Sequence, residues 1–137
     1  MKKKTYPLVY AGKNQQFARS VVVGNLVFLS GMSGRTMETG EVSSDNVVDQ
    51  MKVALDKIRA ALTEAASSMD NIVKSTIYLK RREDYDIMRQ TEREYWKKYA
   101  PRLLEEPPAS TFIVPMSLSK PSMLIEIEVI AMISSDS

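Results

Sequence analysis

The sequence predicts an α+β fold in which two helices pack on one face of a mixed β-sheet. Segments rich in β-branched or alternating apolar residues are typical of strands and occur at 25–31, 71–80, 110–116 and 123–133. Two longer segments with apolar residues at helical spacing separate the first three of these strands. One layer of helices covers only one face of such a sheet. The apolar content of the other face therefore predicts burial against another subunit.

The composition is that of an ordinary globular protein. With 137 residues the chain can bury one sizeable core but not two, so we expect a single domain over 1–137. A hydrophobic share of 44% and a net charge of +2 argue against a membrane or disordered class and favour no particular partner. The apolar stretch after Lys2, Lys3 and Lys4 is too short for a signal peptide, so the expected location is cytoplasmic, without membrane contact.

The chain contains no cysteine and no histidine. This excludes disulfides, thiolate or imidazole catalysis, and zinc sites built from those side chains. Acid–base chemistry would have to use carboxylates, tyrosines, lysines, main-chain groups and water. The sequence shows no D-x-D-x-D loop, so we expect no metal and no cofactor.

The first helix is the best-supported element. The strand "NLVFLSG" ends in a turn at Ser30-Gly31, and a loop over 34–42 follows it. Ser43 or Ser44 is expected to cap the helix, with Asp45 in its first turn. Its apolar residues are Val47, Met51, Ala54, Leu55, Ile58, Ala61, Leu62 and Ala65, and we expect it to end near Ser67-Ser68.

The second half of the chain repeats the alternation of strand and helix. A second helix is predicted from its apolar stripe of Tyr85, Met88, Tyr95, Trp96 and Tyr99, and Pro101 stops it. That stripe is expected to pack against the sheet rather than to bind a cofactor or nucleic acid. Pro115 lacks an N–H group, which predicts an edge position for the strand at 110–116. A further strand is possible around "KTYPLVY" at the start of the chain.

The last strand, "LIEIEVIAM", carries two glutamates among apolar residues. Alternation places Ile125, Ile127 and Val129 on one face, and Glu126 and Glu128 on the other, together with Leu124, Ile130 and Met132. A carboxylate in such surroundings either reaches water or lies in a partly buried site that raises its pKa. The residues alone leave both readings open.

With "GNLVFLSG", "IVKSTIYLK", "DYDIM", "PPASTF" and "LIEIEVIAM" in this order, the sequence resembles the Rid family, also called YjgF or endoribonuclease L-PSP. The resemblance covers about residues 15 to 133. It implies a chorismate-mutase-like fold and a homotrimer whose sheets face inward, with small-molecule clefts at the interfaces. Family members with known chemistry hydrolyse enamines and imines such as 2-aminoacrylate to keto acids and ammonia. By this resemblance Ser30 and Gly31 belong to the substrate site, and Glu126 orients the attacking water.

The sequence departs from the family pattern at the other pocket positions. Ser110 stands where the arginine that binds the substrate carboxylate is expected, and Phe112 where a cysteine is frequent. Phe17 occupies the place of a tyrosine, and Arg89 that of a helix residue that is often asparagine. We therefore predict weak or absent deamination of 2-imino acids, unless Arg89 supplies the missing guanidinium. Arg89 could instead be an ion-pair partner on its own helix.

Two other functions remain open at this stage. One is an L-PSP-type endoribonuclease, which would need the lysine and arginine runs for phosphates and a carboxylate for chemistry. The small net charge and the lack of a basic stripe with interleaved aromatic residues make nucleic acid the less favoured partner. The other is a ligand-binding trimer without catalysis.

Overall fold

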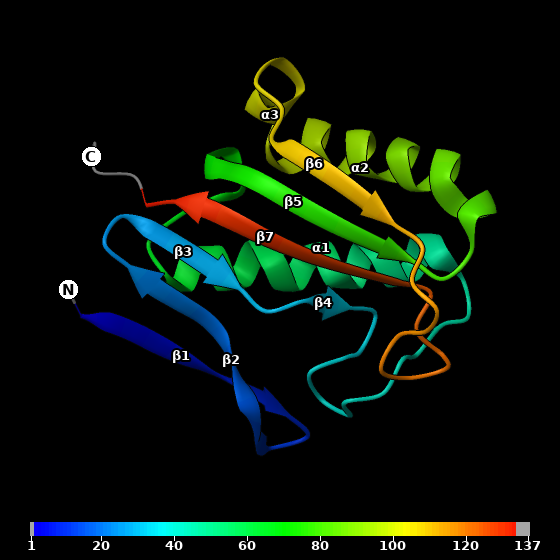
Figure 1. Ribbon diagram of the computed structural model, residues 1–137, viewed down its shortest axis with the longest axis horizontal. Coiled ribbons are helices and arrows are strands. Elements are labelled where there is room, and N and C mark those ends of the chain that lie inside the picture. The colour runs from blue at the N-terminus through cyan, green and yellow to red at the C-terminus, as the bar shows by residue number, and fades with distance from the viewer. Residues whose placement is uncertain (1, 134–137) are drawn as a thin grey trace.

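The computed structural model describes residues 2–133 and confirms the α+β architecture, with one mixed sheet covered on one face by helices (Figure 1). The strands are β1 Lys3–Tyr10, β2 Lys13–Val23, β3 Leu26–Leu29, β4 Met32–Ser33, β5 Ile72–Leu79, β6 Ala109–Ile113 and β7 Ile125–Met132. The helices are α1 Val47–Glu64, α2 Tyr85–Tyr99 and α3 Arg102–Glu105, with single 3₁₀ turns at Met69–Asn71 and Arg82–Asp84.

The strand order is β1-β2-β3-β7-β5-β6, and the short β4 continues the chain after β3 and pairs with β7. All pairs are antiparallel except β5–β6, which is parallel. Parallel neighbours need a crossover connection, and α2 lies within the segment that joins β5 to β6. β6 is an edge strand, as Pro115 predicts.

The hairpin of β1 and β2 shows where the sequence prediction was incomplete. It named one possible strand near the start of the chain and missed β2, the longest strand described. Ala11 and Gly12 form the two-residue turn, with φ angles of 52° and 74°. Two positive φ values are what a tight hairpin turn requires, although alanine rarely adopts them.

The start of α1 corrects another prediction. Its cap is Asn46, whose side chain accepts hydrogen bonds from two main-chain N–H groups of the first turn. Neither Ser43 nor Ser44 caps the helix, because the Ser44 hydroxyl donates to the Asp49 carboxylate instead. Asp49 rather than Asp45 is the acid in the first turn. The helix ends at Glu64, close to the predicted end.

The core lies between α1 and the helix-covered face of the sheet. Its fully buried members include Met51, Ile58, Leu62, Ile77 and Ile125. On α2, Met88 and Tyr95 are buried as predicted, whereas Tyr99 is 37% exposed and lies against the Arg59 guanidinium. The apolar stripe of α2 therefore reaches the core through only part of its length.

No helix of the described residues lies over the other face of the sheet, which is called the open face below (Figure 1). It carries Glu126, Glu128, Ile130 and Met132 of β7, while Leu124, expected beside them, is buried just before the strand begins. Phe28 pairs with Ile130 and is 41% exposed. Within residues 2–133, no helix is both long enough and apolar enough to span a membrane.

Candidate functional site

Glu126 lies against the turn that follows β3. It pairs with Ser33 of β4 and Tyr78 of β5, in the middle of the open face. A Cβ atom on Gly31 would lie 2.8 Å from the carboxyl carbon of Glu126, so only glycine leaves room for this side chain. The fold thus brings two predicted site residues, Gly31 and Glu126, into contact.

The Glu126 carboxylate is half-buried, and no side chain among residues 2–133 donates a hydrogen bond to it. Burial raises the pKa of Glu126, and the neighbouring Glu128 carboxylate raises it further, while Lys57 and Arg35 act in the opposite direction. Glu128 is engaged, because the Tyr78 hydroxyl donates to it at 2.8 Å. Glu126 therefore has free lone pairs and an elevated pKa, which suits a group that accepts a proton from water.

A cluster that sequence reasoning missed lies near Glu126. Lys57 of α1 donates hydrogen bonds to the Tyr10 hydroxyl and to the main-chain oxygen of Arg35, both at 2.8 Å. The Arg35 guanidinium lies 4.0 Å from the centre of the Tyr10 ring. The sequence holds one signal for this lysine. Lys57 follows Ala54 by three residues and precedes Ala61 by four, so it lies beside the apolar stripe of the helix, where a side chain is partly buried.

The polar groups of Ser30 bond within the fold. Its hydroxyl donates to the main-chain oxygen of Ala18, and its N–H to the main-chain oxygen of Arg19. Both bonds tie the end of β3 to β2. The hydroxyl of Ser30 is thus occupied within the fold, and what the turn offers a ligand is its main chain.

Arg89 and Ser110 lie in contact near the edge of the sheet. The Arg89 guanidinium donates to Ser110 Oγ at 3.2 Å, to the Tyr85 hydroxyl at 3.2 Å and to Glu92 at 2.8 Å. The buried Glu92 makes an ion pair with Arg89, one of the alternatives that helical spacing indicated. Burial raises the pKa of Glu92, and the charge of Arg89 partly reverses this. The guanidinium thus lies beside Ser110, already paired with a carboxylate.

These two groups of residues lie on opposite faces of the sheet. Ser110 pairs with Ser75, which is buried on the helix-covered face, whereas Glu126 pairs with Tyr78 on the open face. The side chains of paired residues point to the same face of a sheet. A single protomer therefore does not bring Arg89 and Ser110 together with Glu126.

The two phenylalanines at the altered positions also lie apart. Phe112 follows Ser110 by two residues on β6 and packs edge-on against Tyr85, with ring centres 4.8 Å apart. Phe17 lies on β2 and is 51% exposed. Phe112 thus belongs with the Arg89 group, and Phe17 offers an apolar surface to solvent or to a partner.

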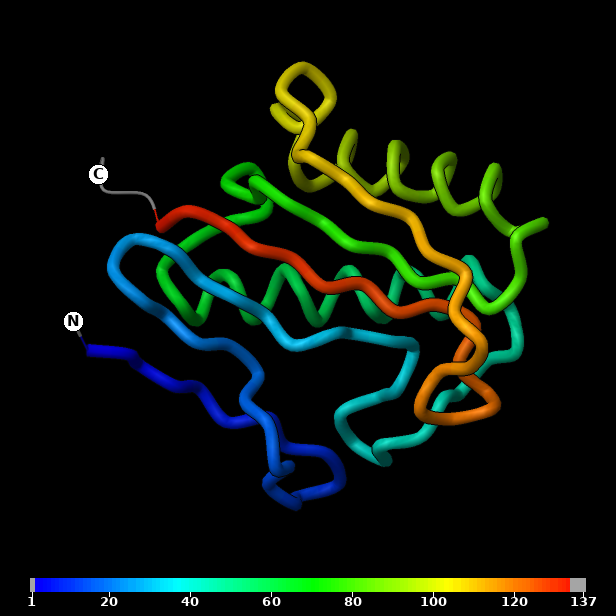
Figure 2. The backbone as a smooth tube through the Cα atoms, viewed as in Figure 1, coloured from blue at the N-terminus to red at the C-terminus, as the bar shows by residue number. Residues whose placement is uncertain are grey.

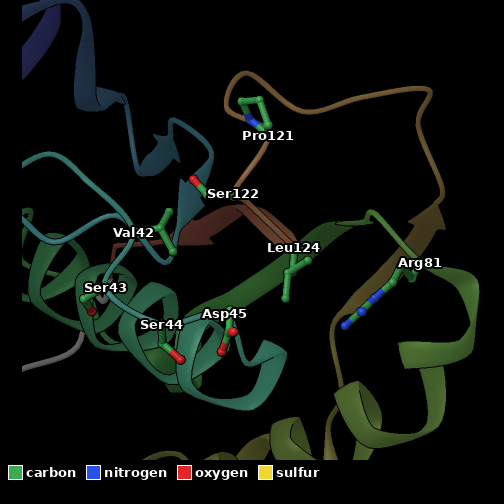
Figure 3. Close-up of a pocket in the computed structure, with 8 residues that line it drawn as sticks. All are labelled: Val42, Ser43, Ser44, Asp45, Arg81, Pro121, Ser122 and Leu124. Carbon is green, nitrogen blue, oxygen red and sulfur yellow. The ribbon is translucent and has the colours of Figure 1, made fainter.

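Two hollows on the surface help to delimit the site. One of about 500 Å³ lies between the segment before α1, the end of β5 and the segment before β7, and contains none of the predicted site residues (Figure 3). Arg81 points into it but is ion-paired with Asp84 at 3.1 Å. A second hollow, of about 250 Å³, lies on the open face beside Glu128 and Lys74. Residues 2–133 contain no cluster of three or more acidic side chains placed to hold a metal ion.

The fold defines the class of protein: an α+β domain with one mixed sheet, helices on one face, and the Ser30-Gly31 turn held against Glu126. The chain belongs to the family described as endoribonuclease L-PSP, also called the Rid or YjgF family, whose sequence profile matches residues 11–133.

Three relatives illustrate the similarity. A RutC family protein of Pyrococcus abyssi is 33% identical over 115 residues, which cover 84% of each chain. Reactive Intermediate Deaminase A of Arabidopsis thaliana is 33% identical over 98 residues, 72% of this chain and 49% of that protein. The crystal structure of Escherichia coli TdcF with bound serine superposes with a TM-score of 0.82, covering 97% of this chain and 100% of that one. At 24% sequence identity, this last similarity concerns the fold.

Proposed function

We propose that the protein is a hydrolase of small imines or enamines that works as a homotrimer, with its sites in clefts between subunits. The observation that carries the proposal is Glu126, a half-buried carboxylate without a hydrogen-bond donor among the described side chains, held against Gly31. Similarity to a reactive intermediate deaminase supports the reaction class. The serine bound to TdcF is an amino acid, which supports a ligand of that size.

In the proposed reaction, Glu126 accepts a proton from water as the water oxygen attacks the imine carbon. The proton then passes to the nitrogen, which gives a carbinolamine. As the carbon–nitrogen bond breaks, the carbinolamine hydroxyl gives its proton by way of Glu126 to the nitrogen, and a carbonyl compound and ammonia leave. Main-chain groups of the Ser30-Gly31 turn position the substrate nitrogen. The raised pKa of Glu126 brings its basicity closer to what a general base needs near neutral pH.

The trimer is supported by the placement of the two residue groups. Because Arg89 and Ser110 lie on the face opposite to Glu126, a site that uses all three needs a second copy to bring its β6 edge to the open face. The open face also exposes Phe28 and Met132, at 41% and 46%, and burial of such side chains stabilises an interface.

The substrate preference follows from Ser110 and Arg89. A substrate carboxylate would have to compete with Glu92 for Arg89, and Phe112 makes the surroundings apolar. We propose that imines without a carboxylate are turned over better than 2-imino acids. A lost charge-assisted hydrogen bond of about 1.5–3 kcal/mol corresponds to a tenfold to hundredfold loss in capture of a carboxylate.

The test compares turnover of a neutral imine and of 2-aminoacrylate, generated in place, by the native protein and by Glu126→Gln. Loss of all turnover in Glu126→Gln supports the proposal, and unchanged turnover contradicts it. Binding of imine analogues without turnover by the native protein would favour a non-catalytic ligand-binding trimer.

Two further variants separate the possible carboxylate anchors. Ser110→Arg should raise activity on 2-aminoacrylate, whereas Ser110→Gln, of similar length but uncharged, should not. Arg89→Ala should abolish any native activity on the imino acid. Robust activity that survives Arg89→Ala would show that another group holds the carboxylate.

A further inference from the structure

Among residues 2–133, Lys57 and Arg35 form a pair of cations without a salt bridge to an acidic side chain. No acidic side chain of residues 2–133 lies within 4.0 Å of the Lys57 ammonium, which instead contacts two oxygens of neutral groups. Burial and the nearby Arg35 charge lower the pKa of Lys57 to about 8. Partial burial of an ammonium next to a guanidinium is unfavourable for folding unless a negative charge compensates for it.

Glu126 lies next to this pair of cations, because its strand partner is Ser33, two residues before Arg35, and the Arg35 main-chain oxygen holds the Lys57 ammonium. The negative charge of Glu126 raises the pKa of Lys57, and the positive charges of Lys57 and Arg35 lower the pKa of Glu126. The other ionisable groups in the field of these residues are Glu128, Tyr78, Tyr10 and Arg19. Of these, Glu128 raises the pKa of Glu126, as burial does. The two cations shift this pKa in the opposite direction.

The position of the Lys57 ammonium is fixed from two sides. One is the tip of the β1–β2 hairpin, which supplies the Tyr10 hydroxyl, and the other is the loop 34–42, which supplies the Arg35 oxygen. Figure 2 shows these two segments side by side at one end of the molecule, where the Ala11 N–H donates to Met37 O at 2.9 Å. Arg35 is held in turn by its Nε, which donates to Gly40 O at 2.7 Å. A cation fixed in this way acts on Glu126 without reorganisation during a reaction.

We propose that Lys57 is a positioning residue for Glu126: its fixed ammonium, together with Arg35, keeps the carboxylate ionised and ready to accept a proton. This inference rests on the proposed function for its meaning in catalysis, but its electrostatic content can be measured without any substrate. The simpler alternative is that Lys57 only fastens the hairpin to the loop. That role would leave the titration of Glu126 unchanged.

The experiment is a titration of the Glu126 carboxyl by ¹³C NMR in the full-length protein. Lys57→Met should raise the pKa of Glu126, and Lys57→Arg, which keeps a cation, should largely restore it. Lys52→Met is the matched control, because Lys52 is an exposed lysine on the same helix, and its removal should leave the Glu126 titration in place. Equal titration curves in Lys57→Met and Lys52→Met would overturn the proposal.

A reciprocal measurement keeps the test decisive if Lys57→Met does not fold. Coupling between two sites is symmetric, so Glu126→Gln should lower the pKa of Lys57 as much as the loss of Lys57 raises that of Glu126. A Lys57 pKa that stays near 8 in Glu126→Gln would overturn the proposal independently.

Turnover distinguishes this inference from the proposed function. If the protein hydrolyses imines, the acid limb of the pH–rate profile should move to higher pH in Lys57→Met, with activity recovered as the pH rises. A loss that no pH recovers would assign Lys57 to structure. If no imine is hydrolysed but the NMR shifts are found, the proposed reaction fails while the coupling of Lys57 to Glu126 stands.

Discussion

Gly31→Ala should disable the site while leaving most of the fold stable. The new methyl carbon would lie 2.8 Å from both Cδ and Oε2 of Glu126, and 2.9 Å from its Cγ. Carbon atoms pack at about 3.5–4.0 Å, so the carboxylate must move by roughly 1 Å. The φ angle of Gly31 lies outside the left-handed region, so the substitution adds no backbone strain there.

The expected magnitudes differ for stability and for function. Overpacking costs about 1–3 kcal/mol, and the lower end applies because the end of a glutamate side chain can turn towards water. A displacement of a reacting group by about 1 Å can cost on the order of a hundredfold in rate. Urea unfolding measures the first effect, and turnover of an imine, or binding of an analogue, measures the second.

Gly34→Ala is the matched control. Its methyl group would lie 2.7 Å from Cβ and 2.9 Å from Cα of the buried Gln50, so α1 itself would have to shift. It should lower the free energy of unfolding more than Gly31→Ala does. Gly31→Ala protein that binds and turns over its substrate within twofold of the native protein would refute the assigned contact between Gly31 and Glu126.

Three further outcomes are expected. Asn46→Ala removes the cap of α1 and should lower the free energy of unfolding by about 1 kcal/mol in urea denaturation. Burial lowers the pKa of Lys57 from 10.5 to about 8, so the free energy of unfolding of the native protein should rise between pH 8 and pH 10.5 relative to that of Lys57→Met, by at most about 3 kcal/mol. If the difference in free energy of unfolding between the native protein and Lys57→Met does not change across that pH range, the burial of the Lys57 charge is contradicted. Light scattering should show a trimer at micromolar concentration for both the native protein and Glu126→Ala, and a stable monomer would remove the intersubunit site.

The sequence predicted the elements whose hydrophobic pattern is strong. The helix at 47–64, the alternation in β7 and the edge position of β6 all follow from local periodicity or from one proline. β2 was missed because only Phe17 and residues 21–23 of its eleven residues are strongly apolar, and its hairpin turn uses alanine at a positive φ. The cap was misplaced because several capping residues are consecutive, and local sequence does not choose between Ser43, Ser44 and Asn46.

Local sequence pattern predicts contacts of the candidate site only where the residues share an element, and Gly31 was placed with Glu126 by the family resemblance instead. Alternation alone separates Glu126 from the core face of β7, and the spacing of Arg89 and Glu92 alone indicates their ion pair. The contacts of Lys57 with Tyr10 and of Arg89 with Ser110 join residues 47 and 21 positions apart. Such pairs depend on how the hairpin folds over α1 and how α2 crosses to β6, which periodicity does not determine.

The position of Ser110 in the sheet indicates that this residue can be substituted without a change of fold. The core depends on α1 and the inward residues of β7, whereas Ser110 lies on an edge strand and is exposed. Substitution of an exposed residue away from the core usually changes stability by no more than about 0.5 kcal/mol. In Ser110→Arg, the new guanidinium would lie beside that of Arg89, with Glu92 as the nearby counterion that Arg89 already uses. A gain of activity on imino acids in that variant would therefore report the carboxylate anchor rather than a change in folding.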